Sequence, residues 1–237
     1  MGIQLWESRM NPRLVEMSVP EDEVQQLEVV HEAQSDIAMP EVKPNSHGVE
    51  PDWSAFHETV SACQQCVLHE NRIFTVPGTG DHSARLMLVG EAPGAEEDRQ
   101  GEPFVGSAGH LLDQMLQAIG LQRQQVYITN LIKCRPPNNR DPEIEELLAC
   151  ESFLMQQIEW LQPSLIVALG RAAAQQLLKT EDSLADLRGH LHNSMAFEMP
   201  VLVTYHPAYL LRKPIEKRKS WQDLQIIMDH LRTGELA

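Results

Sequence analysis

Residues 85–94 read Arg-Leu-Met-Leu-Val-Gly-Glu-Ala-Pro-Gly, and this stretch decides the expected fold. Its first half is a short apolar run, typical of a strand that is buried on both faces of a sheet. A helical pattern over residues 107–119 follows, with its apolar positions on one face, and residues 126–130 form the next apolar run. Strands that alternate with helices predict βα units and a parallel sheet.

The same alternation continues toward the carboxyl end of the chain. Further strands are predicted at residues 164–169 and 201–204, and further helices at residues 142–161, 170–178 and 220–231. Asp141 is the expected N-cap of the first of these helices. We therefore predict an α/β fold, a three-layer α/β/α sandwich with a central four-stranded, mainly parallel sheet.

Charge is distributed unevenly along the 237 residues, whose formal net charge is −15. Residues 1–60 hold 12 acidic and 3 basic residues, which leaves 22 acidic and 16 basic residues for the rest. The total argues against a protein that coats nucleic acid by bulk attraction, but it leaves room for a local basic groove. Residues 1–50 have little periodicity and few aromatic residues, which predicts a disordered acidic tail before a folded domain at 51–237.

Two features of the tail bear on location and partners. The segment Ile-Gln-Leu-Trp at 3–6 is either a docking peptide for a protein partner or an inert end. The first ten residues lack the basic flank and apolar run of a secretory signal, and no apolar stretch is long enough to span a membrane. We expect a cytoplasmic protein with no membrane partner.

Polar residues follow three of the predicted strands. The loop 90–94 follows the first strand, Asn130 ends the second, and Tyr205, His206 and Pro207 follow the last. Open α/β sheets bind ligands at the carboxyl ends of their strands. The three strand ends therefore predict one pocket.

The four cysteines are Cys63, Cys66, Cys134 and Cys150. A C-x2-C pair alone fits a redox pair, half of a zinc knuckle or two buried thiols. A redox pair normally lies at a strand-to-helix turn, whereas this pair precedes the first strand. Four thiolates serve zinc and iron-sulfur clusters alike, and zinc ribbons usually supply two C-x2-C knuckles. We favour a structural 4Fe-4S cluster over zinc.

Several ordered motifs now identify a family. Besides the cysteines, they are Gly-Glu-Ala-Pro-Gly-Ala-Glu-Glu-Asp at 90–98, Pro-Phe-Val-Gly at 103–106, Tyr-Ile-Thr-Asn-Leu-Ile-Lys-Cys-Arg-Pro-Pro at 127–137 and Thr-Tyr-His-Pro-Ala-Tyr-Leu-Leu-Arg at 204–212. Together they resemble the family 4 uracil-DNA glycosylases, which contain an iron-sulfur cluster, over about residues 55–235. The resemblance implies a DNA repair enzyme that flips uracil out of DNA and hydrolyses its N-glycosidic bond, leaving an abasic site.

The resemblance also implies roles for individual residues. Phe104 would stack on the flipped base, Asn130 would pair with uracil O4 and N3–H, and His206 would donate a hydrogen bond to O2. Gly90, Glu91, Ala92 and Gly94 would line the pocket, with Glu91 on the C5 side. Ala92 stands where the best-known uracil glycosylases carry a catalytic aspartate. Glu97 is therefore the expected water-positioning acid, with Glu91 and Asp98 as the other candidates.

DNA contacts are expected from basic residues near the pocket. Residues 205–221 carry five basic residues and one acidic residue, and Lys133, Arg135 and Arg212 are predicted to contact DNA. Leu210 and Leu211 are candidate wedges for the hole that the flipped base leaves. The expected substrate is single- or double-stranded DNA that contains uracil, and the expected state is a monomer. The alternatives are a glycosylase for hypoxanthine or mismatched thymine, and a non-catalytic iron-sulfur module that binds nucleic acid.

Overall fold

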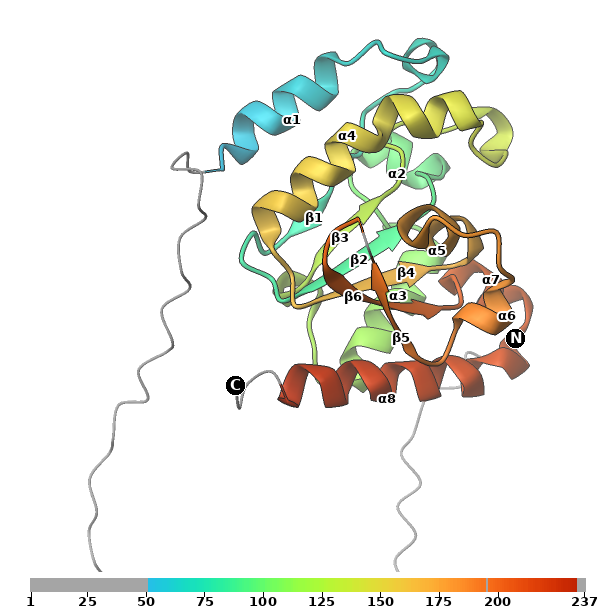
Figure 1. Ribbon diagram of the computed structural model, residues 1–237. Coiled ribbons are helices and arrows are strands. Elements are labelled where there is room, and N and C mark those ends of the chain that lie inside the picture. Colours follow the sequence, from blue (N-terminus) through green and yellow to red (C-terminus); the bar gives the residue numbers. More distant parts are fainter. Residues whose placement is uncertain (1–50, 195, 234–237) are drawn as a thin grey trace, which may run out of the picture. The chain divides into compact units, whose positions relative to one another are not determined.

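The structure is a computed structural model that describes residues 51–194 and 196–233 (Figure 1). The predicted acidic tail, with its segment at 3–6, lies outside the described residues. Those that are described fall within one compact unit.

The sheet has six strands in the order β1-β3-β2-β4-β6-β5. The strands are β1 (Thr79–Gly80), β2 (Leu86–Gly90), β3 (Tyr127–Asn130), β4 (Leu165–Leu169), β5 (Leu191–Ser194) and β6 (Met199–Thr204). The four central strands are parallel, as predicted, and their positions match the apolar runs. The predicted count of four was wrong, because β1 and β5 add antiparallel edges. Neither edge strand has the apolar run that marks a strand buried on both faces.

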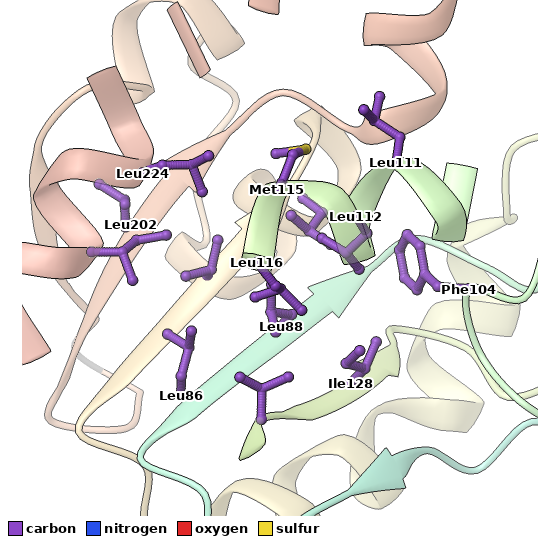
Figure 2. Packing of buried hydrophobic residues seen from close by; sticks show 14 of the residues in the cluster. Leu86, Leu88, Phe104, Leu111, Leu112, Met115, Leu116, Ile128, Leu202 and Leu224 are labelled. Carbon is purple, nitrogen blue, oxygen red and sulfur yellow. The ribbon is translucent and has the colours of Figure 1, made fainter. Parts of the chain in front are cut away.

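Helices cover both faces of the sheet, which confirms the three-layer sandwich. On one face lie α3 (Ser107–Ala118), α7 (Pro207–Arg212) and α8 (Lys217–Thr233), and on the other lie α4 (Ile144–Leu161), α5 (Arg171–Leu178) and α6 (Leu184–Leu187). Figure 2 shows the first layer, where Leu116 of α3 and Leu224 of α8 lie in the same core as Leu88 and Leu202 of the sheet. Because each central strand is buried on both faces, the sheet holds its strand ends in fixed positions.

Four helices within the described ranges were not predicted. They are α1 (Trp53–Ala62) before β2, α2 (Ala95–Gln100) after it, and the short helices α6 and α7. The start of α4 also differs from the prediction, because Glu143 and not Asp141 is its N-cap. Glu146 accepts a hydrogen bond from the Glu143 N–H at 2.8 Å and two from Arg140, and these contacts fix the first turn.

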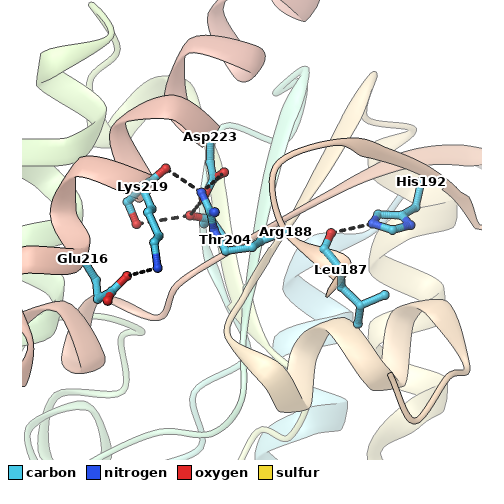
Figure 3. A network of polar contacts seen from close by, with 8 residues as sticks. Leu187, Arg188, His192, Thr204, Glu216, Lys219 and Asp223 are labelled. Atoms are coloured by element: carbon cyan, nitrogen blue, oxygen red, sulfur yellow. Dashed lines mark hydrogen bonds and ion pairs between the residues drawn. The ribbon is translucent and has the colours of Figure 1, made fainter. Parts of the chain in front are cut away.

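A polar network fixes the end of β6 (Figure 3). Thr204 Oγ1 donates to the fully buried Asp223 at 2.7 Å, and Arg188 donates to the same carboxylate at 2.6 Å. Burial raises the pKa of Asp223, while the hydrogen bonds from Thr204 and Arg188 oppose the shift. The Arg188 guanidinium also lies 5.2 Å from the centre of the Tyr205 ring. This network therefore orients the turn that carries His206.

None of the helices in the described part of the chain has the length and apolar character that crossing a membrane requires.

Candidate active site

The ends of the parallel strands open into a cavity of about 450 Å³. The structure brings most of the predicted pocket residues together there, namely Glu91, Ala92, Gly94, Glu97, Phe104, Asn130 and His206, and Arg212, a predicted DNA contact, lines the same cavity. Residues of the loop before α4, including Asp141, form a further part of its wall. The cavity therefore collects side chains from segments that lie far apart in the sequence.

Asn130 lies at the end of β3 and is only 2% exposed. Its Oδ1 atom is buried, and no group in the described residues donates a hydrogen bond to it. Gly90 is its register partner on β2, and a Cβ atom at Gly90 would lie 2.3 Å from Asn130 Oδ1. A buried acceptor without a partner costs about 1–3 kcal/mol. The amide is therefore suited to a ligand that offers an N–H donor.

Phe104 forms another wall, in an unusual backbone conformation with φ at +54°. Its ring would lie 2.7 Å from a Cβ atom at Gly90, and the ring centre is 5.5 Å from that of His206. The turn is held by Arg123, whose Nη1 donates to the Phe104 carbonyl at 3.1 Å. A Cβ atom at Gly109 would lie 1.7 Å from the same carbonyl oxygen, so α3 packs directly on this turn. Phe104 belongs both to the core of Figure 2 and to the pocket.

Sequence reasoning missed Arg123, because nothing near it in the sequence indicates that it reaches back to residue 104. Gly109, a glycine inside the helical pattern, was a clue to close packing of the helix on this turn but gave no sign of Arg123.

His206 is the N-cap of α7, and its Nδ1 accepts a hydrogen bond from the Ala208 N–H at 3.1 Å. A neutral ring with an accepting Nδ1 carries its proton on Nε2. Burial and, to a smaller degree, the nearby Arg212 lower the pKa of His206 to about 4, while Glu97 opposes the shift. At neutral pH the side chain is therefore an uncharged imidazole that can donate from Nε2.

The acids near the pocket have different surroundings. Both oxygens of Glu97 accept backbone hydrogen bonds, from Val105 and Gly106 at 3.0 Å and from Gly94 at 3.1 Å. Glu97 thus ties two loops of the pocket together. Asp98 is buried, accepts from the Ile73 N–H at 2.9 Å and does not line the cavity.

Glu91 faces the cavity beside Asp141. Burial raises its pKa, the negative charge of Asp141 raises it further, and Arg171 opposes the shift. A carboxylate with a raised pKa in a cavity is the type of group that accepts a proton during a reaction.

The predicted DNA contacts divide into two groups. Arg135 is partly exposed and donates to Asn139 at 2.8 Å, and Arg212 is exposed at the rim of the cavity. The prediction for Lys133 was wrong, because its side chain is only 1% exposed and points into the protein. The wedge prediction was wrong for Leu210, which α7 turns into the core, whereas Leu211 is 42% exposed.

The four cysteines line one small cavity beside the end of α1. All are free thiols, with Cys134 and Cys150 buried. Burial raises the pKa of Cys134, and it raises the pKa of Cys150 to about 11. Arg72 donates to Cys134 Sγ at 3.2 Å, and the Lys133 N–H donates to Cys150 Sγ at 3.3 Å.

Within residues 51–194 and 196–233, no three side chains of the cysteine, histidine or acidic type are placed to hold a single metal ion. The cysteines thus share a cavity, as expected, without forming the compact site of one ion.

Comparison with known proteins agrees with this geometry. The model of the uracil DNA glycosylase superfamily matches residues 77–225. The type-4 uracil-DNA glycosylase of Pyrobaculum aerophilum is 43% identical, over 73% of this chain and 91% of the relative. That of Archaeoglobus fulgidus is 42% identical, over 75% and 89%. A type-5 uracil-DNA glycosylase of Thermus thermophilus is 33% identical, over 65% and 86%. The chain belongs to the uracil-DNA glycosylase superfamily and, within it, to the type-4 uracil-DNA glycosylases.

Proposed function

We propose that this protein excises uracil from DNA by hydrolysing the N-glycosidic bond of a flipped nucleotide, and that it leaves an abasic site for repair. One observation carries the proposal. The unpaired Oδ1 of Asn130 and the imidazole of His206 line the same cavity, the first at the carboxyl end of β3 and the second just after β6. Membership of the type-4 family supports the same substrate.

Recognition is assigned to Asn130 and Phe104. Oδ1 of Asn130 accepts from uracil N3–H, and its amide NH₂ donates to O4. Cytosine offers the opposite pattern at these two positions, so it leaves buried polar groups unpaired at a cost of about 1–3 kcal/mol. The base stacks on the Phe104 ring, which contributes about 1–3 kcal/mol. Glu91 lies on the C5 side, where the methyl group of thymine would approach.

Catalysis is assigned to the neutral imidazole of His206. Bond cleavage leaves negative charge on the uracil ring, and Nε2 donates to O2 as this charge develops. One preorganised donor of this type contributes about 10²–10³ in rate. The sugar becomes electrophilic, so the attacking water needs little help from a base.

Water positioning is the role predicted for Glu97, with Glu91 and Asp98 as the other candidates. We propose that Glu91 orients the water, because the carboxylate of Glu97 already accepts three backbone hydrogen bonds. Single-turnover rates of the Glu91→Gln, Glu97→Gln and Asp98→Asn variants rank these acids. If Glu97→Gln lowers the single-turnover rate more than the other two variants do, at unchanged stability, then Glu97 positions the water.

DNA contacts are assigned to Arg212, Arg135 and the basic residues that follow α7. Leu211 is the remaining wedge candidate, since it is exposed at the end of α7. The wedge would offset the unstacking of the flipped base, which costs a few kcal/mol.

The four cysteines are proposed as ligands of a 4Fe-4S cluster, with zinc as the alternative. The donor set fits, because four thiols line one cavity and N–H groups point at two of the sulfur atoms. When bound, the cluster supplies the positive charge that keeps buried thiolates ionised, and it links α1, the segment after β3 and α4. A catalytic domain at 51–237, a monomeric state and a cytoplasmic location are further proposals.

The decisive experiment measures release of free uracil from an oligonucleotide with one uracil, in single- and double-stranded form. Activity on both or on one of these supports the function, and no release under single-turnover conditions contradicts it. Matched duplexes with hypoxanthine or mismatched thymine test the alternative bases. A brown protein with visible thiolate-to-iron absorbance supports the 4Fe-4S cluster. Zinc found by elemental analysis, without that absorbance, would show that the cysteines hold zinc instead.

A further inference from the structure

Lys133 is a buried lysine that the mechanism above does not use. Its side chain is 1% exposed, and none of the ion pairs found among the described residues includes it. Instead, Nζ donates to three neutral acceptors, namely Thr129 Oγ1 at 2.7 Å, the Asn130 carbonyl at 2.8 Å and Gln157 Oε1 at 2.7 Å. Burying an ammonium without a carboxylate is costly, so three short hydrogen bonds are needed to retain it.

The acceptors show where this lysine acts. Thr129 and Asn130 are the last two residues of β3, and Gln157 comes from the middle of α4. The main-chain N–H of Lys133 donates in addition to Cys150 Sγ at 3.3 Å. Lys133 is therefore anchored on the cysteine side by its backbone and on the pocket side by its ammonium.

Asn130 depends on such an anchor. Its Oδ1 atom has no partner in the described residues, so no hydrogen bond to that atom orients the amide before the base arrives. The position of the amide must then be set by the backbone of Asn130 and by packing against Gly90. The Lys133 ammonium holds that backbone at its carbonyl oxygen.

We propose that Lys133 is a positioning residue for Asn130: by binding the Asn130 carbonyl, it fixes the amide edge that recognises uracil. This inference rests on the proposed function. A displacement of about 1 Å of a positioned group can cost about 10²-fold in rate. Loss of the ammonium therefore lowers uracil excision without removing any group that touches the base.

The test is a double-mutant cycle of Lys133→Met with Asn130→Ala, measured as single-turnover rates of uracil release. In the chain with Asn130, we expect Lys133→Met to lower the rate about 10- to 100-fold. In the Asn130→Ala background the same change should lower it less than threefold, because there is no amide left to position. Lys133→Gln keeps a donor and should recover part of the rate.

Gln157→Met is the matched control. It removes one acceptor of the ammonium and a contact to β3, but it leaves the bond between Lys133 and Asn130. Its rate should fall much less than that of Lys133→Met at a similar loss in melting temperature. The Lys133→Met protein should keep the visible absorbance of the parent, because the N–H bond to Cys150 belongs to the backbone.

Equal rate losses in both Asn130 backgrounds would overturn the inference, since Lys133 would then act independently of the amide. A Gln157→Met loss as large as that of Lys133→Met would also overturn it, because general destabilisation would explain both. If Lys133→Met does not fold, the same cycle with Lys133→Gln decides: the rate loss should be smaller than that expected for Lys133→Met, but it should again be larger with Asn130 than in the Asn130→Ala background. Absence of uracil release by the parent protein would instead reject the proposed function.

Discussion

The proposed uracil pocket and the cysteine cavity are both lined by residues of the segment after β3, and they are built in different ways. The pocket takes its side chains from strand ends and the turns that follow them, and packing already fixes Asn130 and Phe104 against Gly90. The cysteines come from the end of α1, a loop and α4, and burial raises the pKa of the two buried thiols. In the proposed function, the pocket is preorganised for a neutral base, whereas the cysteine cavity would need a cation to stabilise thiolates.

This contrast separates two kinds of variant. Changes in the pocket should lower activity at nearly constant stability, because the sheet supports the site. Changes at the cysteines should lower stability first, because the proposed cluster joins segments that the sheet does not hold.

The largest effect is expected from Asn130→Asp. A carboxylate cannot donate to uracil O4, and its charge would be buried in the pocket. A site built to hydrogen-bond a substrate loses about 10⁴-fold when that pattern is broken. Single-turnover uracil release should fall by this order, or the preference should move toward cytosine. Asn193→Asp, on the exposed edge strand β5, is the matched control and should retain the parent rate. Unchanged uracil selectivity in Asn130→Asp would contradict the assignment.

Cys150→Ala should have the next largest effect, on stability. If a cluster joins Cys66 to Cys134, it closes a loop of about 70 residues, and a cross-link of that span contributes about 4 kcal/mol. Its loss should lower the melting temperature by about 8–16 °C and remove the visible absorbance. Ser152→Ala, in the same helix, should do neither. A Cys150→Ala protein with the parent's colour and melting temperature would exclude Cys150 as a ligand.

His206→Ala should lower the single-turnover rate by about 10²–10³, while the melting temperature falls only by the roughly 2–4 °C that loss of a helix cap costs. The expected reason is loss of the Nε2 donor at uracil O2. Substrate binding, measured with a duplex that carries a non-cleavable uracil analogue, should weaken far less than the rate. A variant that keeps the parent rate would remove His206 from the mechanism.

The pH dependence of stability offers a smaller effect. The unfolded chain protonates His206 below its ordinary pKa of 6.5, whereas the folded protein does so only near pH 4. Stability from this residue is thus fully present above pH 6.5 and is lost as the pH falls toward 4, at up to about 1.4 kcal/mol per unit. Denaturant unfolding at pH 6.5 and 4.5 should show a drop that is about 2 kcal/mol larger for the parent than for His206→Asn. Equal drops would show that His206 is not buried in its neutral form.

Sequence alone predicted the parts of the fold in which burial produces a recognisable pattern of apolar residues along the chain. The central strands are buried on both faces, so each of them is a continuous apolar run. The polar residues at the ends of these runs were therefore candidate site residues. Edge strand β5 alternates between exposed and buried residues over only four positions, which is too short to distinguish from a loop.

The site was predicted less completely, because tertiary contacts decide how its side chains point. Lys133 was expected on the surface, as most lysines are, but Gln157 supplies an acceptor for it from 24 positions away. Leu210 and Leu211 are equivalent in sequence, and only the packing of α7 on the core separates them. Arg123 reaches the Phe104 turn across 19 positions, which no local pattern reveals.

The smallest expected effect concerns the rim of the pocket. Arg212→Ala should weaken binding to a uracil duplex about equally for all flanking sequences, because a phosphate contact carries no sequence information. The plot of log binding constant against log salt should become shallower by about one unit. Arg232→Ala is the control, since the carbonyl of its neighbour Leu231 accepts from Arg85, which precedes β2 and thus lies at the amino-terminal end of the parallel strands, opposite the pocket. If both variants change the salt dependence equally, DNA is attracted by overall charge and not by a local contact at the pocket. If only Arg212→Ala does so, the basic rim supplies the attraction for DNA that the acidic chain as a whole lacks.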